Sequence, residues 1–299
     1  MIQVQGVSKS FDGFKALDNL TMTVPTGAVY GLVGPNGAGK STILRHITGI
    51  YRQDEGTVLV DGEPVYENPA VKEKMADIPD EVYYFGSATT RDMAKFYQGF
   101  YPKFDWKRYE ALREAFQNVD EKRPIRRLSK GMQKQSAFWL ALCRKPQILV
   151  LDEPVDGLDP VMRRQVWSLL MSDVEQEGTT VLVSSHNLRE LEDVCDHVGI
   201  LAKGKLLLEQ NLSDLQENVV KLQVVFQGEM PRLAEDIEVL HASHVGRIHT
   251  LIIRGKPREV TERLAGYSPA LLEAMPLTLE EIFIYELGGE DYAVRDIVL

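Results

Sequence analysis

Cysteine is scarce in this sequence of 299 residues, which contains only Cys143 and Cys195. The two are far apart in the chain and do not form the C-x-x-C spacing typical of metal or redox sites. Such scarcity excludes a fold held by disulfides and is typical of a protein kept in a reducing compartment. Both cysteines have apolar neighbours, so we expect them to be buried, reduced thiols.

Long hydrophobic runs are also missing. No segment approaches the run of about 18 apolar residues that suggests a membrane-spanning helix. The N-terminal stretch MIQVQGVSKSF has no basic region followed by an apolar one, so it does not resemble a signal peptide. We therefore expect a cytoplasmic chain that does not cross a membrane itself.

An excess of basic residues is absent as well. The chain has 34 Lys and Arg against 44 Asp and Glu, a net charge of −10. A protein whose main partner is nucleic acid needs clustered Lys and Arg, so this balance argues against nucleic acid. The 44% hydrophobic and 26% charged residues are ordinary for a soluble globular protein, and the length allows one large domain or two unequal ones.

One segment of the chain carries a specific motif. Residues 34–42, GPNGAGKST, match G-x-x-x-x-G-K-[ST], a loop that wraps backbone N–H groups around nucleotide phosphates. Its three glycines can adopt positive φ and let the backbone approach an anion. Lys40 would reach the β- and γ-phosphates, and the Ser41 hydroxyl would hold Mg²⁺. The predicted nucleotide-binding residues are Gly34, Asn36, Gly37, Ala38, Gly39, Lys40, Ser41 and Thr42.

The sequence on either side supports this nucleotide site. Residues 28–33 form an apolar run that predicts a buried strand, and residues 41–48 predict a helix whose positive end faces the loop. A chance match to the motif arises in roughly one chain in a hundred of this length. The strand–loop–helix order makes chance a still poorer explanation.

Two further predicted strands bring polar residues to the same edge of a sheet. Residues 148–151 are apolar and end in Asp152 and Glu153. In P-loop sites a carboxylate placed like Asp152 orders the Mg²⁺ shell, and strand alternation turns Glu153 toward a water that attacks the γ-phosphate. His186 follows the predicted strand 180–183, and that place beside a phosphate loop favours a functional over a structural histidine.

Two other residues allow a plain structural interpretation. Ser129 and nearby amides, at the start of a helix predicted to run to about residue 143, could bind an anion, but helix N-caps of this kind are common. Phe11 follows the first predicted strand and could stack on a base. The residue taken alone favours a place in the core.

The segment 83–106 concentrates nine aromatic residues. They are Tyr83, Tyr84, Phe85, Phe96, Tyr97, Phe100, Tyr101, Phe104 and Trp106. Helical spacing in 91–101 and 106–118 predicts a separate helical piece. We expect a small helical core to absorb most of these rings, and any exposed remainder to form a docking surface for another protein.

The alternation of strands and helices predicts a mostly parallel α/β core. Other predicted elements of this core are strands at 2–7, 20–24, 56–60 and 75–80, helices at 160–177 and 187–195, and a hairpin over 197–209. From about residue 216 the pattern starts afresh and predicts a small α+β domain. Its expected strands are 221–226, 237–242 and 248–254, and its expected helices are 257–265 and 278–286.

Taken in order, these motifs resemble the ATP-binding subunit of an ABC transporter over residues 1 to about 215. Residues 34–42 match Walker A, ILVLDE at 148–153 matches Walker B, and LSKGM at 128–132 matches the signature. The D-loop is 155–159 and the switch histidine is His186. The resemblance implies a P-loop NTPase core with an antiparallel β subdomain, a helical subdomain at about 83–145, and an accessory domain at 216–299.

The resemblance also implies a head-to-tail dimer that traps two ATP molecules. Each ATP would lie on the Walker A loop of one chain and under Ser129, Lys130 and Gly131 of the other, and Asp159 would couple the two sites. The implied catalytic residues are Glu153 and His186, and Phe11 becomes an adenine-stacking residue, which reverses the interpretation from that residue alone.

The sequence departs from the family pattern at three positions. Asp80 stands where the Q-loop glutamine is usual; as an acceptor it can still meet Mg²⁺, so with Ser41 and Asp152 it completes the expected metal ligands. Lys130 replaces a signature glycine and either adds a cation near the γ-phosphate of the opposing subunit or points into solvent. Met132 replaces the usual signature glutamine.

ATP and Mg²⁺ are the cofactors that the resemblance implies, and separate membrane-spanning subunits are the implied partners, so the chain would lie at the inner face of the cell membrane. TLEEIFIYEL at 278–287 resembles ABC-2 type exporters. Because the motifs are intact we expect a homodimer, with a heterodimer as the alternative. A soluble ABC ATPase of translation or DNA repair is the rival function, but tandem cassettes, coiled-coil insertions and basic arms are all missing.

Overall fold

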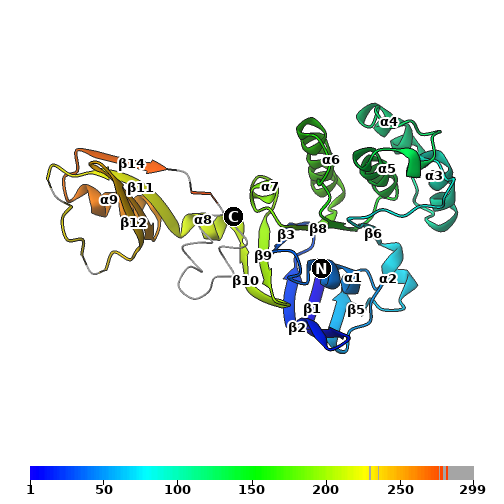
Figure 1. The fold of residues 1–299 in the computed structure, drawn as a ribbon, viewed down its shortest axis with the longest axis horizontal. Coiled ribbons are helices and arrows are strands. Elements are labelled where there is room, and N and C mark those ends of the chain that lie inside the picture. Colours follow the sequence, from blue (N-terminus) through cyan, green and yellow to red (C-terminus); the bar gives the residue numbers. More distant parts are fainter. Residues whose placement is uncertain (229, 235, 276, 279–280, 282–299) are drawn as a thin grey trace. The chain divides into compact units, whose positions relative to one another are not determined.

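The computed structural model describes residues 1–228, 230–234, 236–275, 277–278 and 281 (Figure 1). The chain divides into two compact units. The first unit comprises Met1–His186 and His197–Glu209, and the second comprises Asn187–Asp196 and the chain from Gln210 onward. The sequence predicts a boundary after residue 215. The second unit instead starts at Gln210 and also includes Asn187–Asp196.

A six-stranded sheet with the order β10-β9-β3-β8-β7-β6 forms the centre of the first unit. Its strands are β3 (Val29–Val33), β6 (Met75–Ile78), β7 (Ile148–Asp152), β8 (Thr180–Ser185), β9 (His197–Ala202) and β10 (Lys205–Asn211). The pairs β6–β7, β7–β8, β8–β3 and β3–β9 are parallel, and every residue of β3, β7 and β8 is buried. Continuous apolar runs are typical of parallel strands covered on both faces, so the predicted parallel α/β core is confirmed.

An antiparallel sheet with the order β2-β1-β4-β5 packs beside it. It comprises β1 (Ile2–Phe11), β2 (Phe14–Val24), β4 (Glu55–Val60) and β5 (Glu63–Pro64). Asp12 and Gly13 both have positive φ, as a two-residue hairpin turn between β1 and β2 requires. Ile2 pairs with Val24 and Val60, and the inward residues of this sheet share one hydrophobic core with helix α1 (Lys40–Ile47).

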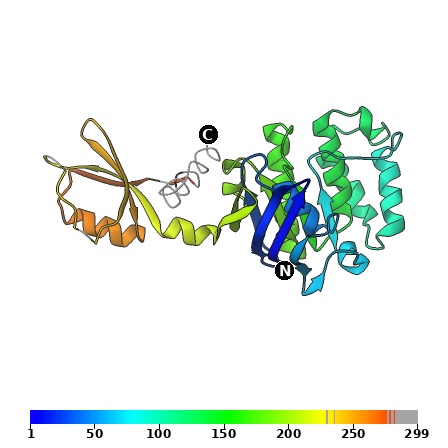
Figure 2. The same cartoon turned by 60° about the horizontal axis from the view of Figure 1, so that its bottom comes forward.

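The helices α3 (Thr90–Phe100), α4 (Trp106–Ala115) and α5 (Lys130–Cys143) lie together in both views (Figures 1 and 2). Thr89 and Asp92 form a capping box at the start of α3, and Asp105 caps α4. The Trp139 ring stacks on Tyr109 at 4.6 Å, and its indole N–H donates to the Tyr109 main-chain oxygen at 2.9 Å. The helical piece expected from the aromatic segment is present.

The expectation that this helical core absorbs most of the nine rings holds in part: Phe104 is buried, Tyr84, Tyr97, Tyr101 and Trp106 are half-buried, and the other four are exposed. Among them only Phe104 is fully buried, and the core is built instead from Tyr109, Phe116, Phe138 and Trp139. On α3 the inward positions are held by Met93 and Ala94. Elsewhere on α3, Tyr97 is half-buried, whereas Phe96 and Phe100 are exposed, as are Tyr83 and Phe85 in the preceding segment.

Other helices in the described residues are α2 (Pro69–Glu73), the 3-10 helix η1 (Ile125–Arg127), α6 (Pro160–Glu177), α7 (Arg189–Glu192), α8 (Leu212–Glu217) and α9 (Pro257–Ala265). Helix α6 has the predicted bounds, because Asp159 caps its start and Gly178 ends it in the left-handed conformation. Helix α7 is much shorter than the predicted 187–195 and has no side-chain cap. Within the described residues no helix has the length and apolar character needed to cross a membrane.

The second unit contains a four-stranded sheet with the order β12-β13-β11-β14. Its strands are β11 (Val219–Val225), β12 (Val239–Val245), β13 (Ile248–Arg254) and β14 (Leu271–Met275). Leu222, Leu251 and Ile253 of the sheet share a separate core with Val260 and Leu264 of α9. Strand β14 was missed because LLEAM favours a helix, whereas pairing with β11 makes it a strand. Apart from Thr278 and Glu281, the predicted helix 278–286 lies outside the described residues.

Both cysteines are buried, as expected. Burial raises the pKa of the Cys143 thiol to about 12 and also raises that of Cys195. At neutral pH both side chains are therefore neutral thiols that pack as small apolar groups.

Candidate nucleotide-binding and hydrolysis site

The predicted phosphate loop lies between β3 and α1. Gly37 and Gly39 have φ of 82° and 109°, which side chains rarely allow. Gly34, in contrast, is not among the positive-φ residues, and it is needed for another reason. A Cβ at Gly34 would lie 2.2 Å from the Leu201 main-chain oxygen, so the loop leaves β3 in close contact with β9.

Lys40 closes over this loop from the first turn of α1. Its ammonium donates to the Gly34 oxygen at 2.6 Å and lies 3.3 Å from Glu153 Oε1. The side chain is only 6% exposed, so its charge is balanced by these oxygens rather than by water. The structure thus joins the phosphate loop to the acidic end of β7, which the sequence places more than a hundred residues later.

Asp152 and Ser184 join the ends of β7 and β8. Ser184 Oγ donates to Asp152 Oδ1 at 2.5 Å, and the Asp152 side chain is buried. Ser41 and Asp152 line the same small pocket, beside Ile78 and Pro79. A hydroxyl and an ionised carboxylate that face one pocket are hard oxygen ligands of the kind that Mg²⁺ prefers, so these two residues fit the predicted metal role.

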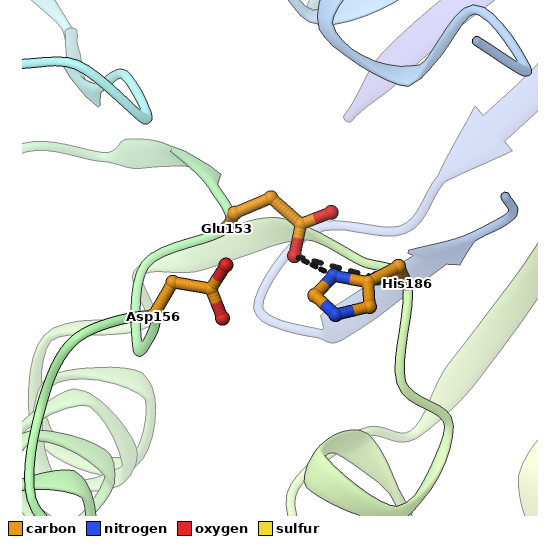
Figure 3. A group of neighbouring side chains, drawn as sticks. All are labelled: Glu153, Asp156 and His186. Atoms are coloured by element: carbon orange, nitrogen blue, oxygen red, sulfur yellow. Dashed lines mark hydrogen bonds and ion pairs between the residues drawn. The ribbon is translucent and has the colours of Figure 1, made fainter. Parts of the chain in front are cut away.

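Glu153 follows β7 and adopts a left-handed backbone with φ of 46°. The direction of its side chain is therefore set by this turn, and not by the strand alternation that we used to predict it. Glu153 Oε2 accepts the His186 main-chain N–H at 3.3 Å and lies 2.9 Å from His186 Nδ1 (Figure 3). The predicted catalytic pair is brought together at the carboxyl edge of the sheet.

Asp156 is a neighbour of this pair that the sequence analysis did not single out. Its carboxylate and the ligand atoms of Glu153 and His186 all lie within 4.8 Å of one another (Figure 3). Asp156 lies in the predicted D-loop, which was the available signal. The carboxylate reaches this position because a turn folds the loop back toward Glu153, with the Asp156 main-chain nitrogen 3.4 Å from the Glu153 main-chain oxygen.

The signature residues occupy the start of α5. Ser129 Oγ accepts the Met132 N–H at 3.3 Å, so it is an N-cap here, while Lys130 is exposed. A Cβ at Gly131 would lie 2.8 Å from the Gly157 oxygen, which explains the glycine. The D-loop thus packs against the signature. The predicted contacts of Ser129, Lys130 and Gly131 with a second ATP stay predictions.

The predicted coupling residue Asp159 caps the next helix. Its Oδ1 accepts the Val161 and Met162 N–H groups, each at 3.0 Å, at the start of α6. A carboxylate at a helix N-terminus is favoured by the helix dipole. Asp159 therefore fixes the end of the D-loop, and its coupling role across a dimer stays a prediction.

Phe11 and Asp80 complete the predicted set. Phe11 ends β1 with 38% of its surface exposed and its ring 5.5 Å from that of Tyr51, so the core position favoured by the residue alone is wrong. Its adenine-stacking role stays a prediction. The Asp80 side chain is 57% exposed and its Oδ1 lies 3.3 Å from the ammonium of Lys134, a residue that the sequence analysis did not consider. Its role as a metal ligand also stays a prediction.

Comparisons with known proteins identify the family of this chain. The ABC transporter family model matches residues 17–156. The ABC transporter ATP-binding protein YtrB of Bacillus subtilis is 31% identical over 97% of this chain and 99% of its own length. The lantibiotic transport ATP-binding protein SrtF of Streptococcus pyogenes is 31% identical over 76% and 99%. The Nod factor export ATP-binding protein I of Sinorhizobium fredii is 29% identical over 97% and 86%.

Solved structures show the same fold. The ATP-binding subunit of an ABC transporter superposes with a TM-score of 0.66 at 25% identity, over 72% of this chain and 92% of its own. The ATP-binding cassette MJ0796, in a dimeric post-hydrolysis state with ADP and Pi, gives 0.65 at 22% identity over 71% and 99%. Because the family model covers the phosphate loop and YtrB matches over almost the whole of both chains, the chain belongs to the family of ABC transporter ATP-binding proteins.

Proposed function

We propose that this ABC transporter ATPase works as a head-to-tail dimer that powers export through separate membrane-spanning subunits. The observation that carries the proposal is the joining of Lys40, Glu153 and His186 at one edge of the sheet. This arrangement places a phosphate-binding cation, a carboxylate and an imidazole around one point. Phosphoryl transfer to water needs those three functions.

Hydrolysis follows from the groups present. Lys40 binds the β- and γ-phosphates of ATP, and the loop amides of residues 34–39 bind the same oxygens. A water attacks the γ-phosphorus, its proton moves to the Glu153 carboxylate, and the bond to the β–γ bridging oxygen breaks to leave ADP. His186, held by Glu153 Oε2, contacts the γ-phosphate and keeps the carboxylate oriented.

Ser41 and Asp152 are the residues that would hold Mg²⁺, because both line one pocket beside the phosphate loop. Mg²⁺ supplies charge neutralisation at the phosphates when it is bound. The Ser184 hydroxyl occupies one oxygen of Asp152, so the other oxygen is left for the metal shell. Asp80 is the third predicted ligand.

A second copy of the chain would complete each site. The exposed start of α5 presents Ser129, the Lys130 cation and the Gly131 backbone, and a helix N-terminus of this kind favours a bound phosphate. The dimeric ADP and Pi complex of MJ0796, which has the same fold, supports this arrangement. A partner of different sequence is the alternative to a homodimer.

Three exposed rings support docking to a membrane-spanning subunit. Phe85, Phe96 and Phe100, here called the aromatic patch, are in ring contact, with centroids 5.3 Å apart for Phe85–Phe96 and 4.8 Å for Phe96–Phe100. A contiguous exposed apolar patch is typical of an interaction site. Export, rather than import, is supported by the likeness to the Nod factor export ATP-binding protein I.

The experiment that tests this proposal measures the mass in solution of Glu153→Gln, with and without ATP and Mg²⁺. Glutamine keeps the shape but cannot accept the proton, so ATP should stay bound and hold two copies together. We expect a monomer that becomes a dimer only with ATP, and a variant that also carries Lys40→Ala should remain monomeric. A Glu153→Gln chain that binds ATP yet stays monomeric would exclude the homodimer.

A further inference from the structure

Lys134 is a buried cation next to the catalytic carboxylate. Its side chain is 6% exposed, in the second turn of α5. The ammonium donates to the main-chain oxygen of Glu153 and lies 3.3 Å from Asp80 Oδ1. A buried ammonium is costly unless acceptors replace its water, so these two contacts are what allow a lysine at this position.

Three segments meet at this ammonium. Asp80 follows β6, Glu153 follows β7 and Lys134 lies on α5. Asp80 and Lys134 are 54 positions apart in the chain, and Lys134 and Glu153 are 19 positions apart. Lys134 and Asp80 also line a pocket of about 520 Å³ together with Lys130, Asp156 and Gly157. The ion pair therefore lies where the signature helix, the D-loop and the end of β6 come together.

The backbone of Glu153 requires support at this place. A non-glycine residue with φ of 46° is uncommon, and such a conformation persists when its surroundings hold it. The Glu153 N–H donates to Ser184 at 3.2 Å, to both the main-chain oxygen and Oγ. Lys134 holds the carbonyl at the other side of the residue. The direction of the carboxylate depends on both restraints.

We propose that Lys134 is a positioning residue for hydrolysis: it fixes the Glu153 carbonyl, and Asp80 is the counter-ion that holds Lys134 in place. This inference rests on the proposed role of Glu153 in activating water. It gives the unusual acid at position 80 a role, since a carboxylate balances a buried ammonium and a neutral glutamine does not. It also ties the helix that begins with Ser129 to the catalytic carboxylate of the same chain.

The test compares two substitutions of Lys134 in the purified full chain. Lys134→Met removes the donor and the charge, whereas Lys134→Gln keeps an N–H donor for the Glu153 carbonyl. We expect Lys134→Met to lower the kcat of ATP hydrolysis about 10- to 100-fold, with KM and the Kd for ATP changed less than about twofold, because only the geometry of Glu153 is affected. Lys134→Gln should recover most of the kcat.

Lys107→Met is the matched control, because Lys107 is an exposed lysine of the neighbouring helix α4. It should keep the kcat of the unsubstituted chain. A normal kcat in Lys134→Met, or a Lys134→Gln chain as slow as Lys134→Met, would overturn the positioning role. An equal loss of ATP affinity and kcat would also overturn it, since that pattern indicates damage to the fold.

Asp80→Asn tests the role of Asp80 as the counter-ion of Lys134. It also provides a test of the proposal if Lys134→Met fails to fold. We expect a smaller loss of kcat than in Lys134→Met, no further loss when the two are combined, and an unchanged Mg²⁺ concentration for half-maximal hydrolysis. A raised Mg²⁺ requirement in Asp80→Asn would instead assign Asp80 to the metal and overturn the counter-ion role. A kcat equal to that of the unsubstituted chain would overturn it as well.

Glu153→Gln separates this inference from the function on which it rests. Normal hydrolysis by Glu153→Gln would overturn the proposed role of Glu153 and remove the target of Lys134. Loss of hydrolysis in Glu153→Gln together with normal hydrolysis in Lys134→Met would overturn the positioning role alone.

Discussion

Glu153 is the residue on which most contacts of the site converge. Lys40 and His186 contact its carboxylate, while Ser184 and Lys134 hold its main chain. Lys40 lies on α1, Lys134 lies on α5, and Ser184 and His186 lie at the end of β8. The position of the carboxylate therefore depends on how these three elements are placed relative to one another. Catalytic efficiency depends on such pre-organisation, because a carboxylate free to rotate would activate water only part of the time.

Lys40→Ala tests the contribution of this single residue to ATP binding at the phosphate loop. The substitution removes a charge-assisted bond to phosphate worth about 1.5–3 kcal/mol, so we expect ATP affinity to fall about 10- to 100-fold. Fluorescence titration with a labelled ATP analogue measures the affinity, and circular dichroism checks that the core stays folded. Normal turnover by a folded Lys40→Ala chain would contradict the assignment of the nucleotide site.

Helix α5 shows how one element serves both the fold and the site. Its start carries the signature, its second turn carries Lys134, and its last two turns bury Phe138 and Trp139 in the helical core. Anchoring by these rings keeps the start of the helix in a fixed position relative to the D-loop. The helical core therefore positions catalytic groups that it does not itself contain.

Glu121 accepts hydrogen bonds from residues of helix α4, and we therefore expect the stability of the fold to depend on pH. Burial raises the pKa of Glu121, but bonds from Tyr109 at 2.8 Å and Arg113 at 3.0 Å outweigh it and hold the pKa below the usual 4.5. A lowered carboxyl pKa stabilises the fold above the unfolded pKa, and this stabilisation is lost as the pH falls through the folded pKa.

Glu121→Gln should therefore lower the free energy of unfolding by about 2 kcal/mol near neutral pH. The difference in free energy of unfolding between Glu121→Gln and the unsubstituted chain should disappear as the pH falls below about 4.5. Urea unfolding at neutral pH and at acidic pH measures this difference. Glu110→Gln is the control, since Glu110 is half exposed on α4 and pairs with Arg113 at the surface. A difference in free energy of unfolding that stays constant with pH would contradict the role of the Glu121 charge.

The aromatic patch makes a prediction about coupling. Replacing Phe85 and Phe100 by alanine should leave ATP hydrolysis by the isolated chain unchanged, because neither ring touches the site. Binding to the membrane-spanning subunits should weaken by about 2 kcal/mol or more, as expected for buried aromatic contacts. Phe14→Ala is the control, an equally exposed ring on β2. Transport that survives the double substitution would place the docking surface elsewhere.

In the described part of the chain, each of the two units has a hydrophobic core of its own. The nucleotide site lies entirely within the first unit. Because YtrB matches over 97% of the chain, the resemblance to that relative includes the second unit, whereas the solved cassettes match about 72%. The match to YtrB thus extends over the second unit, whereas SrtF, matched over 99% of its own length, covers 76% of this chain.

Calorimetry of Glu153→Gln tests this organisation. Separate cores predict two unfolding transitions, and a ligand stabilises only the unit that binds it. We expect ATP and Mg²⁺ at about a hundredfold excess over Kd to raise the Tm of one transition by about 5–10 °C and leave the other in place. An equal rise of both transitions would contradict separate units.

The sequence by itself determined the elements whose signals are local. The phosphate loop is one continuous segment, the bounds of α6 follow from Asp159 and Gly178 beside it, and β7 is an unbroken apolar run. For the same reason Asp152, Glu153 and His186 could be placed at one sheet edge from the ends of parallel strands. Local conformation depends on neighbours in the chain, which a sequence displays directly.

Only the tertiary structure decided which distant residues share an environment. It assigned Asp80 to Lys134, brought Asp156 to His186, explained Gly34 by the oxygen of Leu201, and left the aromatic patch outside the helical core. Each outcome depends on contacts between segments tens of residues apart or more. Burial and pairing are set by how elements pack in space, and no pattern within a single segment records that packing.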